Sequence, residues 1–258
     1  MNNTKYSEFH QIHIPKTAGT LLCTFLNANL TPILLKNNFK IFGYNEQTMR
    51  HHGWGPVTEN QYLVSSFRNP SKRMVSHFFQ MLSHPAVDNI KVTRENRYIY
   101  DIGSRVNNYE QPTKNEFFNW IEKNDKWLSN YQSKNFFYRA DDLFIPKCIL
   151  GLAGPLSIKD FNKPEVLDNI KRVNLLIKSE NLKTENFENI LNKILNDYNL
   201  KNDKPINLDY NNRNRSKKSF EFYNSLSLKE VEYIESLNTL DLEIYNTESF
   251  FWDPKSII

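Results

Sequence analysis

Twice in this chain a strand-like run leads through a short loop into an amphipathic helix, and this order limits the folds available to it. The first unit consists of a predicted strand at residues 9–14, the loop PKTAG and a predicted helix at 19–29. The second consists of a strand at 61–67 and a helix that begins near Pro70. Parallel strands need crossover connections of this kind, and these are usually helices. The sequence therefore predicts an α/β fold with a parallel β-sheet flanked by helices.

The helix of the second unit has clear signals for its start and its buried face. Asn69 is a favourable N-cap residue, and Pro70 falls at the first helical position. An apolar face follows at the spacing i, i+3, i+4, i+7 and comprises Val75, Phe78, Phe79 and Leu82. His77 lies off that face and is expected to be exposed.

Further strands are predicted at residues 39–44 and 172–179, and a further helix at 184–198. Two S/T-x-x-E capping boxes, at Thr113 with Glu116 and at Ser227 with Glu230, each predict a helix start.

Composition is that of one ordinary domain, spanning residues 1–258, with 39% hydrophobic residues. A polar stretch near residues 84–112 is interpreted as an insertion. The sequence has no apolar run long enough for a transmembrane helix, and its polar start does not resemble a signal peptide. We therefore expect a cytoplasmic protein without a membrane segment.

Charge and cysteine content exclude several other classes. The formal net charge of +4 is mild; it suits an anionic ligand but does not indicate nucleic acid. Two cysteines, Cys23 and Cys148, make neither a disulfide framework nor a zinc site. We find no carboxylate cluster suited to magnesium and expect no metal. The sequence does not indicate an oligomeric state.

The loop after the first strand has the residues of an anion site. Ligands of parallel α/β sheets bind at the carboxyl ends of strands, where a helix start offers free N–H groups. Gly19 allows close backbone approach, Thr17 and Thr20 add hydroxyl groups, and Lys16 adds a point charge. The order differs from the Walker A motif, in which the lysine follows the second glycine. A solvated lysine in an ordinary turn is the alternative for this loop taken alone.

Two motifs together carry a resemblance to a known family. HIPKTAGT at residues 13–20 has the form H-I-x-K-T-x-G-T, and RNPSKRMVS at 68–76 has the form R-[DN]-P-x-x-R-x-x-S. Both resemble motifs of the sulfotransferases that use 3′-phosphoadenosine 5′-phosphosulfate (PAPS). The closest likeness is to the branch of the heparan sulfate 2-O- and 6-O-sulfotransferases and related microbial proteins. Weaker likenesses occur at residues 130–136 (N-x-Q-[TS]-[RK]) and 237–245 (N-x-x-D-x-x-[IL]-Y).

The resemblance implies a sulfotransferase fold, with a P-loop-like parallel sheet, and a nucleotide site with two anionic poles. It assigns the 5′-phosphosulfate to the loop Pro15, Lys16, Thr17, Ala18, Gly19, Thr20 and Leu21. It assigns the 3′-phosphate to Arg68 and Ser76, and it implies a loop over the nucleotide that contains Arg215, Ser216 and Lys217. The cofactor would be PAPS and the product 3′-phosphoadenosine 5′-phosphate (PAP).

The resemblance also implies catalytic residues. Lys16 would stabilise the leaving oxygen, and a histidine between the two motifs would act as general base. An H-x-x-W arrangement, as in the 6-O branch, selects His51 with Trp54; histidines flanking a glycine, as in the 2-O branch, favour His52. We lean to His52, and both alternatives stay open. His10 and His13 are expected to be structural.

The acceptor is expected to be the hydroxyl of a carbohydrate, with a small alcohol, lipid or peptide as alternatives. Arg94 and Arg97 lie among tyrosines and could contact an anionic glycan together with Trp54; a solvated insertion is the other interpretation. Two other functions are weighed against the sulfotransferase: a phosphotransferase that uses ATP, and a nucleotide-binding module without catalysis.

Overall fold

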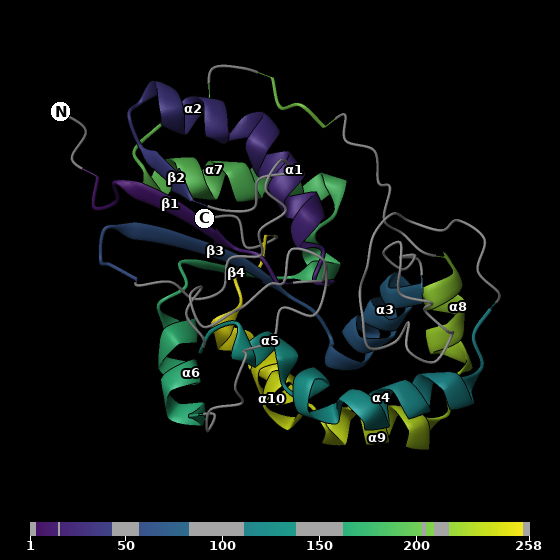
Figure 1. The fold of residues 1–258 in the computed structure, drawn as a ribbon. Coiled ribbons are helices and arrows are strands. Elements are labelled where there is room, and N and C mark those ends of the chain that lie inside the picture. The colour runs from purple at the N-terminus through teal and green to yellow at the C-terminus, as the bar shows by residue number, and fades with distance from the viewer. Residues whose placement is uncertain are drawn as a thin grey trace, which may run out of the picture.

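The centre of the computed structural model is a four-stranded parallel sheet with the strand order β2-β1-β3-β4 (Figure 1). The structure describes residues 4–14, 16–42, 57–82, 111–137, 162–202, 205–208 and 217–254. The strands are β1 (Glu8–Ile12), β2 (Lys40–Phe42), β3 (Gln61–Phe67) and β4 (Leu175–Lys178). The predicted α/β class with a parallel sheet is confirmed.

Helices cover both faces of the sheet (Figure 1). One face carries α1 (Gly19–Asn29), α2 (Thr31–Lys36) and α7 (Phe187–Asp197), and the other α5 (Tyr131–Lys134), α6 (Lys163–Lys171) and α10 (Thr239–Asn246). Side chains of β3 alternate between them: Tyr62 and Val64 belong to the first core, and Leu63 to the second. This period of two is expected for a strand buried on both faces.

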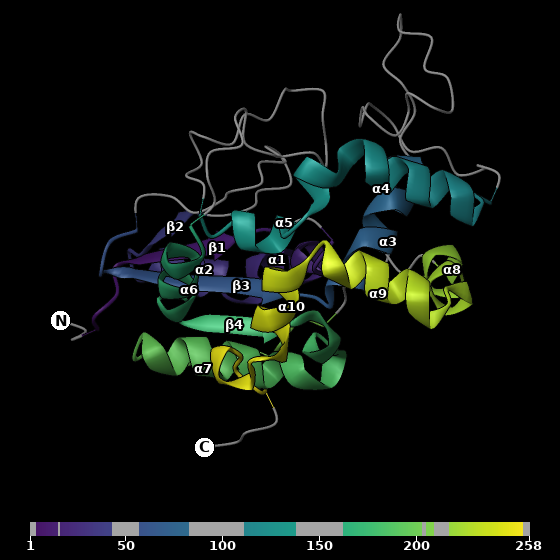
Figure 2. The same cartoon turned by 90° about the horizontal axis from the view of Figure 1, so that it is seen from below.

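Beside the sheet, four helices pack around a separate apolar cluster, as both ribbon views show (Figures 1 and 2). They are α3 (Pro70–Leu82), α4 (Lys114–Leu128), α8 (Lys217–Ser225) and α9 (Leu228–Ser236). The predicted apolar face of α3 is buried here against Trp120 and Phe222. Among the described residues, short 3₁₀ turns occur at Ser179–Asn181, Thr184–Asn186 and Glu248–Phe250.

Local start signals are confirmed at three helices. The Asn69 side chain accepts a hydrogen bond from the Lys72 N–H at 3.1 Å. Both capping boxes form, at the starts of α4 and α9. The bounds of α1 and β3 are those predicted.

Two strands are shorter than predicted, and a third, β2, starts at Lys40, one residue later than predicted; its predicted end at residues 43–44 lies outside the described residues. β1 ends at Ile12 because the Ile14 carbonyl turns to accept the N–H and the hydroxyl of Thr17. β4 starts only at Leu175, because two of the residues before it have other roles. Arg172 ends α6, and the Asn174 side chain accepts a hydrogen bond from the Leu63 N–H at 2.7 Å.

The prediction that His77 is exposed is wrong. Its side chain is fully buried, with Nδ1 3.2 Å from Arg73 Nη1 and the ring against Trp120 and Tyr131. The reason is that α3 is packed by α4, α8, α9 and α10 and has little solvent-facing surface.

The expected insertion at residues 84–112 lies outside the described residues, apart from 111 and 112. In the part of the chain that the structure describes, no helix is both long and apolar enough to cross a lipid bilayer.

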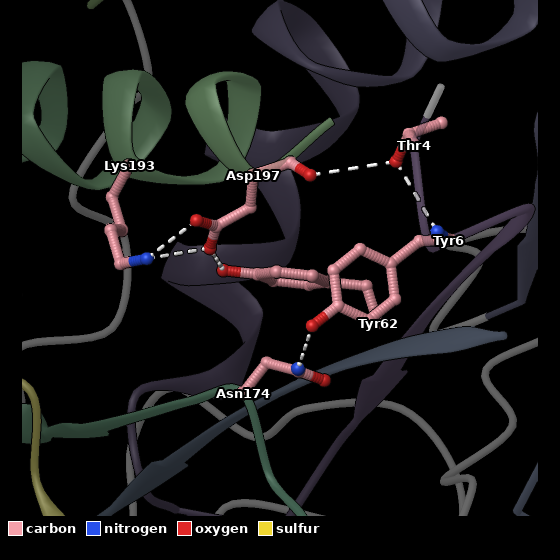
Figure 3. Close-up of polar contacts among 6 residues, drawn as sticks. All are labelled: Thr4, Tyr6, Tyr62, Asn174, Lys193 and Asp197. Carbon is pink, nitrogen blue, oxygen red and sulfur yellow. Dashed lines mark hydrogen bonds and ion pairs between the residues drawn. The ribbon is translucent and has the colours of Figure 1, made fainter. Parts of the chain in front are cut away.

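Tyr6 and Tyr62 link the amino end of the sheet to the C-terminal end of α7 (Figure 3). The Tyr62 hydroxyl donates to Asp197 Oδ2 at 2.6 Å, and Lys193 Nζ lies 2.6 and 2.7 Å from the two carboxylate oxygens. The Tyr6 ring packs edge-on against Tyr62 with centroids 5.0 Å apart, and its hydroxyl accepts from Asn174. These contacts join four parts of the chain that are distant in sequence, at the edge opposite the carboxyl ends of the strands.

We predict that Tyr62→Phe lowers the free energy of unfolding by about 1 kcal/mol at pH 7, because it removes one hydrogen bond to a carboxylate that keeps its lysine. Burial, and then the Asp197 hydrogen bond, raise the pKa of Tyr62 above its ordinary 10.0. The folded state therefore keeps a proton that the unfolded chain releases, so stability falls as the pH rises above about 10. The variant should lose less stability there than the wild type.

Urea denaturation between pH 7 and 11 measures both effects. The control is Tyr233→Phe on α9, because Tyr233 is 39% exposed. Equal effects of the two substitutions would contradict the assigned role of Tyr62.

Candidate functional site

The strand order identifies one edge of the sheet as a place for a ligand. β1 lies between β2 and β3, so the chain leaves β1 toward one side and later returns to the other. In open parallel sheets, the crevice outside the carboxyl ends of strands at such a switch point is the usual ligand site. β1 and β3 end side by side here, with Ile12 paired to Ser65. The loops after these two strands contain Lys16 and Arg68.

The loop between β1 and α1 has a strained backbone. Lys16 and Ala18 have φ angles of 67° and 62°, in the left-handed region that side chains other than glycine rarely adopt. Such residues cost on the order of 1–3 kcal/mol each and cluster at ligand-binding loops. The Thr17 hydroxyl, fully buried between them, donates to the Ile14 carbonyl at 2.9 Å. Since it has only one hydrogen, Ser66 must be the donor of their 3.0 Å bond. Thr17 thus ties the strained loop to β3.

The start of α1 faces the same edge. The N–H groups of Gly19, Thr20 and Leu21 have no acceptor within the helix, and the helix dipole adds partial positive charge there. Thr20 and Leu21 are partly exposed, as is Lys16. The arrangement can accept an anion through backbone N–H groups with a lysine beside them.

Packing inside the protein by itself explains why residue 19 is glycine. A Cβ atom at this position would lie 2.8 Å from Nδ1 and 2.9 Å from Cε1 of the buried His13 ring. The Gln11 side chain donates to the Gly19 carbonyl at 3.2 Å, which holds the start of α1 against β1. The sequence suggested close approach of a ligand; packing on His13 is sufficient to require glycine.

Arg68 follows β3 directly and is partly buried next to the Lys16 loop. Its Nη1 donates to the Lys16 carbonyl at 3.2 Å, and it makes no ion pair with any described carboxylate. Burial lowers the pKa of Arg68, and electrostatic interactions with Glu180 and Tyr245 oppose this shift in part. A partly buried guanidinium without an adjacent carboxylate is stabilised by an incoming anion.

The backbone of Arg68 is held by a residue to which the sequence had assigned no function. The Arg68 N–H donates to Gln132 Oε1 at 2.8 Å, and Gln132 Nε2 donates to the Arg68 carbonyl at 2.9 Å. Gln132 is fully buried. The only signal for it in the sequence was the weak likeness of residues 130–136 to a family segment.

Of the remaining predicted residues, the structure describes Ser76 and Lys217. Ser76 is partly exposed on α3, and its hydroxyl makes no hydrogen bond to another described residue. Lys217, at the start of α8, is exposed, and its Nζ lies 3.6 Å from Glu221 Oε1. Eight predicted site residues lie outside the described residues: Pro15, His51, His52, Trp54, Arg94, Arg97, Arg215 and Ser216. Among the described residues, no three His, Cys, Asp or Glu side chains are grouped as metal ligands.

Comparison with protein-family models and with curated proteins finds no match to this chain.

We predict that Gly19→Ala lowers the free energy of unfolding by about 1–3 kcal/mol, because its methyl group overlaps the His13 ring. At an unobstructed helix position the same change would be stabilising, by up to about 1 kcal/mol. Urea denaturation of Gly19→Ala, His13→Ala and the double variant measures the coupling. The penalty should largely disappear in the His13→Ala background; an equal penalty in both backgrounds would show that His13 is not the cause.

Proposed function

We propose that the chain is a PAPS-dependent O-sulfotransferase built on a P-loop-like form of the α/β fold. The observation that supports this most is the partly buried Arg68 guanidinium, without an ion-pair partner among the described residues and hydrogen-bonded to the Lys16 loop. PAPS has two anionic groups, the 5′-phosphosulfate and the 3′-phosphate. The Lys16 loop with the start of α1 is suited to the first, and Arg68 to the second.

Because β1 and β3 are neighbouring strands, the Lys16 loop and Arg68 lie close together in space. Lys16 and Arg68 lie 52 residues apart in the chain, yet the Arg68 side chain reaches the Lys16 backbone. One nucleotide could therefore contact both. In the proposed mode, Ser76 adds a hydroxyl to the 3′-phosphate, and Arg215, Ser216 and Lys217 cover the nucleotide.

The reaction is an in-line transfer of a sulfuryl group. The acceptor oxygen attacks sulfur while the bond from sulfur to the bridging phosphate oxygen breaks, and PAP leaves with that electron pair. Lys16 stabilises the charge that grows on the bridging oxygen. The proton of the acceptor passes to a histidine, because imidazole titrates near neutral pH.

His52 is the proposed base and His51 its alternative. The proposed acceptor is a carbohydrate hydroxyl, with Trp54, Arg94 and Arg97 as candidate contacts. These assignments rest on the sequence motifs alone.

We predict that PAP stabilises the protein and that ATP and ADP do so much less. At about 100 times its dissociation constant, PAP should add about 2.7 kcal/mol. For a chain of this size that is a rise in melting temperature of roughly 5–10 °C. Arg68→Ala should abolish the rise, and differential scanning fluorimetry measures it.

Arg172→Ala is the matched control for Arg68→Ala. Arg172 also donates from its guanidinium to a backbone carbonyl, that of Val57 at 3.0 Å, but it precedes β4 at the opposite edge of the sheet. It should keep the full response to PAP. A response to ATP equal to that to PAP would instead favour a phosphotransferase, and no response to any nucleotide would remove the support for the sulfotransferase.

We also predict that Lys16→Ala lowers the rate of PAP release from PAPS about 10²- to 10³-fold, with a much smaller change in PAP affinity. The difference arises because Lys16 acts on charge that develops during transfer. The assay uses a panel of saccharide acceptors, with Lys123→Ala on the exposed side of α4 as control. Wild-type turnover by Lys16→Ala would exclude the proposed role, and no turnover by the wild type with any acceptor would favour a binding module.

A further inference from the structure

The end of β3 leaves the backbone of Arg68 without partners in the sheet. The ladder between β3 and β4 stops at the pair Phe67 and Lys178. The N–H and C=O groups of the next residue, Arg68, must therefore be satisfied elsewhere, since a buried peptide group without partners is costly. How they are satisfied fixes the backbone from which the Arg68 side chain extends.

Gln132 satisfies both groups at once. Its side-chain amide accepts from the Arg68 N–H and donates to the Arg68 carbonyl, at 2.8 and 2.9 Å, as a neighbouring peptide would do in a ladder. An amide can do this without charge. A carboxylate at the same position would offer no donor and would neutralise the nearby guanidinium, whereas the amide leaves that charge available for an anion.

Gln132 is held in turn by reciprocal capping of two helices. The N–H groups of Gln132 and Ser133, at the start of α5, donate to the Asp241 carboxylate at 3.0 and 2.8 Å. The N–H groups of Leu240 and Asp241, at the start of α10, donate to Asn130 Oδ1 at 2.9 and 3.2 Å. Asp241 of α10 thus caps the start of α5, and Asn130, the residue just before α5, caps the start of α10. This fixes α5 although it has only four residues.

A buried cation strengthens this arrangement from α3. The Arg73 side chain is fully buried, and its guanidinium carbon lies 4.4 Å from the centre of the Tyr131 ring. Arg73 and Asp241 attract each other in this buried region. The segment that carries Gln132 is therefore fixed from α10 and from α3.

We infer that Gln132 is a positioning residue for Arg68, and that it sets the preference of the site for a nucleotide with a 3′-phosphate. This inference rests on the proposed function. Gln132 does not touch the ligand in this assignment; it acts by fixing the peptide of Arg68 and leaving its charge unneutralised.

The test compares the affinities for PAP and for 5′-AMP, which differ only by the 3′-phosphate, by isothermal titration calorimetry. Gln132→Met has a similar size but lacks both hydrogen-bonding groups. It should reduce the ratio of the two affinities roughly 10- to 100-fold, toward the ratio of Arg68→Ala, because a small displacement of a positioned group has effects of this size. Affinity for 5′-AMP should change little. Gln132→Asn keeps the amide but is one methylene shorter; it should lower the ratio as well, and it serves if the Met variant does not fold.

Asn29→Leu is the matched control. Asn29 makes the same pair of bonds to one backbone segment, since its amide donates to the Asn207 carbonyl at 2.9 Å and accepts the Asn207 N–H at 2.6 Å. It lies at the far end of α1 from the Lys16 loop. This variant should lose stability but keep the wild-type ratio of affinities.

The outcomes separate the inference from the function beneath it. If the wild type prefers PAP and the Gln132 variants keep the same ratio, the inference is wrong and the sulfotransferase proposal is unaffected. If the Asn29 and Gln132 variants lower the ratio equally, Gln132 has only a structural role. If the wild type shows no preference for PAP over 5′-AMP, the proposed function fails, and the inference fails with it.

Discussion

Partial burial of a guanidinium without an adjacent carboxylate lowers the stability of the folded state. Arg68 has such a guanidinium, and the contacts at the carboxyl edge of this sheet are arranged around it. Its side chain is fastened to the Lys16 carbonyl and its backbone to Gln132. These partners are neutral, so the positive charge is held in place and not cancelled. In a structural ion pair, by contrast, a carboxylate of the same protein neutralises the charge.

Much of the fold could be predicted because its signals are local. The bounds of α1 and β3 and the capping side chain of Asn69 follow from residues that lie next to one another in the sequence. The burial of His77 could not be predicted, since it depends on how many helices pack against α3. Likewise, the bond between Tyr62 and Asp197 joins residues 135 positions apart, and no pattern in either segment indicates the other.

The candidate site was predictable to a similar degree. The two sequence motifs were enough to assign Lys16 and Arg68 to one nucleotide site, and the described structure has them in contact. The left-handed backbone of Lys16 and Ala18 was not foreseeable, because neither residue type favours it. The position of Gln132 depends on Asp241 and Asn130, which only the tertiary structure brings together.

The reciprocal capping of α5 and α10 has a consequence for the order in which the protein assembles. A helix of four residues has no stability of its own in water. α5 therefore lacks the carboxylate that caps its start until Asp241, 109 residues beyond Gln132, has left the ribosome. The Lys16 loop, Arg68 and Gln132 emerge much earlier, and until then the helix that carries Gln132 lacks its cap. A nascent chain that is stalled before α10 should thus have a sheet but a less firmly held Arg68 backbone. If the proposed function is correct, full nucleotide affinity would arise only after synthesis has passed this helix.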